Sequence, residues 1–146
     1  MKLRYIAWNG AVAALFVALS YLLPIRLGSS LYMLAAFDPG LVPGLAVGNA
    51  LAGVHHRPLD LIEGAVIGAF TPWLCSKVGP LWSPVVVAVV PSVWVAFWLT
   101  QVVGLSTAVV PGIVMGQLIA AAVGGIAILP LGRRLWKQGF LRGAER

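Results

Sequence analysis

Apolar residues fill this chain in five long blocks, and polar residues fall in the short gaps between them. The blocks cover approximately residues 5–23, 27–53, 59–76, 84–103 and 107–131. Runs of about 18 or more apolar residues are typical of membrane spans. Inside the second block, Asp38-Pro39-Gly40 is a turn sequence, so this block divides into segments at 27–37 and 40–53. The pattern predicts an all-α integral membrane protein, a bundle of six transmembrane helices of which some are short or kinked.

Composition and charge agree with a membrane location. Hydrophobic residues make up 60% of the 146 residues and charged residues 10%, whereas a soluble domain is typically about 25% charged. We therefore expect one membrane domain over residues 1–146, within the lipid bilayer, with a basic cytoplasmic tail at 132–146.

The basic residues also predict the orientation of the spans. With six crossings, Arg26 and Arg57 fall on one side. On the side of the chain ends fall Lys2, Arg4, Lys77, Arg133, Arg134, Lys137, Arg142 and Arg146. Basic residues mark the cytoplasmic side, so both termini are expected to be cytoplasmic. Because these residues gather at span ends and form no stripe interleaved with aromatic residues, the net charge of +6 does not indicate nucleic-acid binding.

The sequence lacks the motifs of common catalytic sites. It has no G-x-S-x-G elbow and no phosphate-binding P-loop, and Cys75 is its single cysteine. We expect no enzyme activity, no cofactor and no resident metal. Uphill transport of a solute would need an ion gradient or partner subunits.

A cluster of polar residues surrounds the gap at His55-His56-Arg57. Asp60 and Glu63 follow it, three residues apart and hence on one helical face. Three interpretations stay open: a membrane-surface turn in which Asp60 caps its helix, a ligand pocket roofed by the loop, and a metal site. The metal site is disfavoured because the histidines are adjacent and lack an H-x-x-x-H spacing.

Other polar residues lie at membrane depth, where an unpaired polar group is costly. Asn49 and Gln117 carry amides, which suit either an interhelical hydrogen bond or the edge of a heterocycle. Trp94 and Trp98 share a helical face and fit either a stacked planar ligand or an interfacial aromatic belt. We expect Asn49 and Gln117 to face one cavity toward the outer side, with Asp60 and Arg26 near its mouth.

Small residues recur at intervals of four along several segments. Ala7/Ala11 and Ala14/Ala18 form such pairs in the first segment, and glycines form them in later ones. Residues four apart share a helical face, so these stripes permit close backbone approach. They suit packing within the bundle or, on the terminal first helix, docking of another membrane protein.

The run from Pro43 to Ala52 reads PGLAVGNALA and is followed by Pro58-Leu59-Asp60 and Gly64. This pattern resembles the queuosine-precursor transporter (QueT) family, whose members are substrate-binding S components of energy-coupling factor (ECF) transporters. Arg26 stands upstream at the distance where the family carries an arginine. The similarity extends downstream through Ser83-Pro84-Val85 and residues 115–118, so it covers roughly residues 7–131.

The resemblance implies a six-helix bundle in a bacterial cell membrane that takes up a small planar solute, a queuosine precursor of the 7-deazaguanine or queuine type. It implies a membrane coupling (T) subunit and two cytoplasmic ATPase subunits as partners. Ala7 and Ala11, with Ala14 and Ala18 in reserve, match the family's A-x-x-x-A docking pattern. The expected substrate-binding residues are Arg26, Asn49, Asp60, Trp94 and Gln117.

Two positions depart from the family pattern. Ser29 stands where the family carries an acid, and Gln117 stands where it carries a glutamate. A carboxylate accepts from the ring N–H and amino groups of a purine-like precursor, and an amide replaces it only in part. The alternative functions are an oligomeric channel or structural partner packed through small residues, and a membrane-embedded enzyme using Asp60, Glu63 and the histidines.

Overall fold

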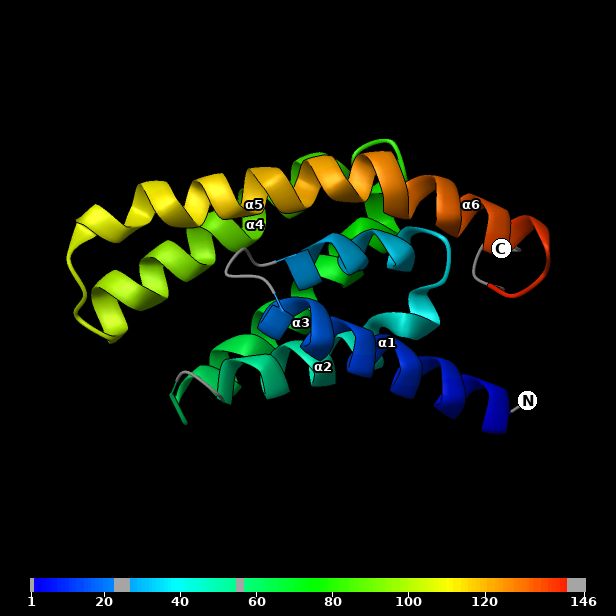
Figure 1. Ribbon diagram of the computed structural model, residues 1–146, viewed down its shortest axis with the longest axis horizontal. Helices are drawn as coiled ribbons and strands as arrows, with labels where there is room; N and C mark the ends of the chain where they lie inside the picture. The colour runs from blue at the N-terminus through cyan, green and yellow to red at the C-terminus, as the bar shows by residue number, and fades with distance from the viewer. Residues whose placement is uncertain (1, 23–26, 55–56, 142–146) are drawn as a thin grey trace.

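The computed structural model describes residues 2–22, 27–54 and 57–141 (Figure 1). Every regular element in these ranges is helical, which confirms the expected all-α fold. In chain order the elements are α1 (Lys2–Leu22), η1 (Leu27–Ala36), η2 (Pro39–Leu41), α2 (Val42–Val54), α3 (Asp60–Val78), α4 (Ser83–Phe97), η3 (Trp98–Val102), η4 (Thr107–Val109), α5 (Val110–Val123), η5 (Gly124–Ile128) and α6 (Leu129–Lys137). The η elements are 3₁₀ helices, apart from η3 and η5, which are π-helical segments.

Four helical stretches of the described chain are long and apolar enough to cross a membrane. They are Leu3–Tyr21, Asp60–Val78, Ser83–Val102 and Thr107–Lys137. Two further apolar stretches, Leu27–Ala36 and Pro39–Val54, are shorter. A 3₁₀ helix rises about 2 Å per residue, so η1 spans about 20 Å of a hydrocarbon layer that is about 30 Å thick. Six crossings therefore stay a prediction.

The element boundaries follow from local chemistry. Asp38 caps η2, because its side-chain Oδ1 accepts a hydrogen bond from the backbone N–H of Gly40 at 2.9 Å. Glycines with positive φ follow α3 and α6, at Gly79 (φ 78°) and Gly139 (φ 73°). The apolar block of the sequence ends near residue 131. The last helix nevertheless continues to Lys137, and the glycine with positive φ follows only at position 139.

The short helix η1 lies at the centre of the fold. Its residues from Gly28 to Ala35 are all buried. Figure 1 shows it between the long rod of α5, η5 and α6 on one side and the layer of α1, α2 and α3 on the other. A ten-residue 3₁₀ helix is unusual, and backbone of this kind is tolerated at membrane depth where protein surrounds it.

Glycines allow α1, α2 and α3 to pack closely. A Cβ added at Gly48 of α2 would lie 2.8 Å from the Cβ of Phe16 in α1. A Cβ added at Gly68 of α3 would lie 2.8 Å from the Cβ of Asn49 in α2. The glycine stripes of α2 and α3 therefore serve internal packing.

Both ends of the described chain lie at one end of the molecule (Figure 1). The Arg4 guanidinium, at Nη2, donates to the backbone oxygens of Gly139 at 2.8 Å and Phe140 at 3.1 Å. The guanidinium carbon also lies 5.7 Å from the centroid of the Phe140 ring. These contacts tie the segment after α6 to the start of α1.

Candidate functional site

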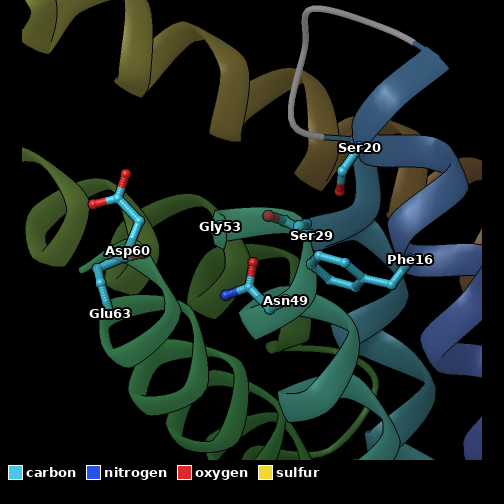
Figure 2. Close-up of a pocket in the computed structure, with 8 residues that line it drawn as sticks. Phe16, Ser20, Ser29, Asn49, Gly53, Asp60 and Glu63 are labelled. Carbon is cyan, nitrogen blue, oxygen red and sulfur yellow. The ribbon is translucent and has the colours of Figure 1, made fainter. Parts of the chain in front are cut away.

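A small polar pocket lies where α1, η1, α2 and α3 meet (Figure 2). Its volume is about 50 Å³. Its lining residues are Phe16, Ser20, Ser29, Asn49, Ala52, Gly53, Asp60 and Glu63. A hydrophobic ring, two hydroxyls, an amide and two carboxylates thus gather in one place within an otherwise apolar bundle.

The two carboxylates lie in the first turn of α3. Asp60 is 9% exposed and Glu63 is 4% exposed. Acidic residues are favourable there because backbone N–H groups at a helix N-terminus carry partial positive charge. Asp60 also accepts a hydrogen bond, at 3.1 Å between its Oδ1 and the indole Nε1 of Trp98. The wall of the pocket formed by α3 is therefore acidic, and Asp60 is held from the side of η3.

Asn49 joins α2 to α3 and also faces the pocket. Its amide Nδ2 donates to the backbone oxygen of Gly64 at 2.9 Å, so the interhelical interpretation of this residue is correct. Figure 2 shows the amide nitrogen turned toward α3 and the oxygen turned toward the open space. The oxygen has no hydrogen-bond partner among the described residues, which leaves it available to a ligand.

Gln117 lies apart from this pocket. It is fully buried in α5, and neither of its amide atoms has a hydrogen-bond partner in the described chain. The pocket lining includes Asn49 and not Gln117, so the two do not share the cavity expected from the sequence. The reason is that η1 packs between α5 and the layer of α1 to α3, an arrangement that helix depth alone does not predict.

Trp94 also lies elsewhere. It lines an apolar hollow between α3 and α4, together with Ile67, Phe70 and Phe97. Its indole Nε1 is buried without a hydrogen-bond partner in the part of the chain that the structure describes. Trp98, one turn later, is the tryptophan that reaches the polar site through Asp60.

Arg26, His55 and His56 lie outside the described residues. Asn49 and Asp60 are thus the two expected site residues that the structure brings together. Within residues 2–22, 27–54 and 57–141, no three His, Cys, Asp or Glu side chains form a group that would hold a metal ion.

Six residues of the pocket lining were not among the expected substrate-binding residues: Phe16, Ser20, Ser29, Ala52, Gly53 and Glu63. Phe16, Ser20 and Ser29 gave little signal, because serine and phenylalanine are common in membrane helices. Glu63 gave a clear one, since a second acid one turn after Asp60 shares its helical face. Ser29 is buried and occupies the position where the family resemblance led us to expect an acid.

The small residues of α1 lie on an uncovered face. Ala7, Ala11, Ala14 and Ala18 are all exposed, while Val12 and Phe16 are buried on the opposite face. A Cβ added at Gly10 would meet nothing within 4 Å. The alanine stripe of α1 therefore differs from the glycine stripes of α2 and α3, which are filled by neighbouring helices.

Apolar helices of membrane-spanning length around a small polar pocket are typical of a helical membrane transport protein. Comparison with protein families identifies the kind of transport protein. The family described as QueT transporter matches residues 6–133, and the chain belongs to the QueT transporter family. This is a family of transporters. No curated protein and no solved structure gave a match.

Proposed function

We propose that this protein is the substrate-binding S component of an ECF-type importer, and that it takes up a queuosine precursor of the 7-deazaguanine or queuine type. The observation that carries the proposal is the pocket itself. Two largely buried carboxylates, an amide oxygen and an aromatic ring line one cavity in a chain of the QueT transporter family.

The chemistry of the pocket suits the polar edge of such a solute. A 7-deazaguanine ring presents a ring N–H and an exocyclic amino group as neighbouring donors. Carboxylates are pure acceptors, so Asp60 and Glu63 match these donors. Asn49 offers a further acceptor, and Phe16 offers a ring face on which a planar solute can stack. Glu63 thereby supplies the carboxylate that the resemblance led us to expect at position 117.

The size of the pocket adds a requirement. Small-molecule sites usually measure about 300–1,000 Å³, whereas this cavity measures about 50 Å³. Binding of a solute of this size therefore requires the cavity to widen. Trp98 is a natural reporter of that change, because its indole is bonded to a carboxylate of the pocket.

Energy for uptake comes from partners in this proposal. A membrane coupling subunit docks on α1, through Ala7 and Ala11, with Ala14 and Ala18 extending the same face, and it connects the protein to two cytoplasmic ATPase subunits. The support is the exposed alanine stripe, which no described element covers. Small side chains let a partner helix approach closely and gain dispersion contacts.

The proposed topology has six crossings in a bacterial cell membrane, with both termini cytoplasmic. The described chain ends and α6, which carries Arg133, Arg134 and Lys137, lie at one end of the molecule, whereas α3, which Arg57 precedes, begins at the opposite end (Figure 1). This asymmetry follows the tendency of basic residues to stay on the cytoplasmic side.

Calorimetric titration of the purified protein with queuine and its 7-deazaguanine precursors tests the substrate. We expect saturable binding of at least one of them and none of adenosine, which lacks the paired donors. Absence of binding by every precursor would reject the substrate class. Native mass spectrometry of the same sample tests the alternative of an oligomeric channel, for which a stable ring of copies is required.

A further inference from the structure

A second hollow lies at the other end of the molecule, along the last helix. Its volume is about 470 Å³. Gly125, Leu129, Arg133 and Lys137 line it at intervals of four residues, so they follow one face of the helix from η5 to the end of α6. Pro130 and Arg134 complete the lining.

The charged end of this hollow lies near the depth of a membrane surface. The helical stretch Thr107–Lys137 has 31 residues, which at 1.5 Å per residue gives about 46 Å. The hydrocarbon layer is about 30 Å thick, so the helix must project from it. Gly125 and Leu129 then lie toward the hydrocarbon, and the cations of α6 lie at the level of the headgroups.

The three cations of this hollow have no counter-charge among the residues that the structure describes. Arg133, Arg134 and Lys137 are exposed, and none makes a hydrogen bond or ion pair with another described residue. Two other cations of the described chain do have partners: Arg4 donates to backbone oxygens, and the Lys77 ammonium lies 5.9 Å from the centroid of the Trp73 ring. The cations of the hollow are thus left for a ligand.

The apolar end of the hollow is open. A Cβ added at Gly125 would meet only the Cγ of Pro84, at 3.9 Å, so the absence of a side chain leaves room along the helix. Ile126, beside it, is 80% exposed. A ligand that fits both ends carries an anionic group next to a hydrocarbon chain.

We propose that this hollow binds one anionic phospholipid of the leaflet at the chain ends. Arg133, Arg134 and Lys137 hold its phosphate, and an acyl chain lies along Leu129 and Gly125. Arginine forms paired hydrogen bonds to phosphate, and basic pockets at membrane helices are suited to such headgroups. The inference rests on the membrane location and is independent of the solute in the other pocket.

Native mass spectrometry of the detergent-purified full chain, mixed with phosphatidylglycerol or phosphatidylcholine, tests the site. We expect the wild-type protein to retain phosphatidylglycerol about tenfold better than phosphatidylcholine. The variant Arg133→Gln/Lys137→Gln should lose this preference. The matched control Arg57→Gln/Lys77→Gln removes the same two charges from exposed positions elsewhere and should keep it. An equal loss in both variants, or in neither, overturns the proposal.

Two further arms separate the lipid from other sources of phosphate. Gly125→Leu fills the apolar end without changing charge and should weaken phosphatidylglycerol binding. Unchanged binding in that variant would overturn the assignment of the acyl chain. Inorganic phosphate and glycerol phosphate should fail to displace the lipid, and equal competition by either would identify a site for soluble anions instead. Titration with queuine on the same samples reports separately on the solute pocket.

Discussion

A polar side chain within the bundle is costly unless it forms a hydrogen bond or binds a ligand, because hydrocarbon offers no hydrogen-bonding groups. Asn49 and Asp60 each make one side-chain hydrogen bond to the protein, and both line the pocket. Gln117 has no hydrogen-bond partner among the described residues. These residues are where substitution is most informative.

Glu63→Gln should weaken binding of the queuosine precursor by about tenfold or more. The substitution replaces an acceptor with a group that also donates, and a hydrogen bond to a charged group contributes about 1.5–3 kcal/mol. Isothermal calorimetry measures the change in Kd. Asp38→Asn is the matched control, since Asp38 lies near the start of α2 and outside the pocket lining. Equal affinities of Glu63→Gln and wild type would remove Glu63 from the site.

Trp98→Phe tests whether the hydrogen bond between Trp98 and Asp60 couples Trp98 to the pocket. The variant loses the indole N–H that bonds Asp60, and the ligand-induced change in tryptophan fluorescence should shrink markedly. The remaining tryptophans serve as an internal reference. A full-sized fluorescence change in Trp98→Phe would show that Trp98 does not report on the pocket.

Gln117→Leu should stabilise the ligand-free protein. A buried amide without hydrogen bonds costs about 1–3 kcal/mol, and leucine has a similar volume. The expected result is a higher unfolding temperature in detergent. The affinity of the same variant for the precursor tests whether Gln117 also contacts the solute. A fall of about tenfold would place Gln117 in the widened, ligand-bound cavity. A lower unfolding temperature would mean that the amide stabilises the folded protein through a partner such as a buried water.

At the scale of elements, α1 and α2 carry similar stripes of small residues with different surroundings. The α2 stripe is filled by α1, whereas the α1 stripe is exposed. Replacing a small residue by leucine should therefore affect partner docking on α1 and folding on α2.

Ala11→Leu should block capture of the coupling subunit while leaving folding and precursor binding unchanged. A leucine on the exposed face holds the partner helix away and removes its dispersion contacts. Co-purification of the coupling subunit with tagged protein measures the effect. Ala122→Leu, on an exposed face of α5, is the matched control. Undiminished capture by Ala11→Leu would contradict the docking proposal.

Gly48→Leu on α2 should instead prevent folding, because its side chain would overlap Phe16.

At the scale of the whole molecule, the membrane topology depends on whether η1 and α2 cross. Cysteine labelling from each side of the membrane tests whether they do. Single cysteines are introduced at Pro39, Ser106 and Gln138 in a Cys75→Ala background. Six crossings with cytoplasmic termini require 39 and 138 to react from the cytoplasmic side and 106 from the outer side. Reaction of 39 from the outer side would make η1 and α2 a re-entrant pair, leaving the four long crossings.

Much of the fold is determined by the sequence alone. The length of the apolar blocks indicated helices, because a backbone in hydrocarbon must satisfy its own hydrogen bonds. Asp38-Pro39-Gly40 located the break between η1 and α2, since proline and glycine there favour a turn and Asp38 caps the short helix η2. The placement of Asn49 and Asp60 near each other was also predictable, because one short gap joins their helices.

Only the tertiary structure decided which helices are neighbours, and with that the composition of the site. Burial of η1 in the centre separated Gln117 from Asn49, although both lie on apolar helices. It also brought Phe16, Ser20 and Ser29 to the pocket, where their sequence context gave little indication. The physical reason is that helix packing depends on how side chains fit around the whole circumference of each helix. A linear pattern of apolar residues specifies that a helix is buried in apolar surroundings, and leaves open whether protein or lipid provides them.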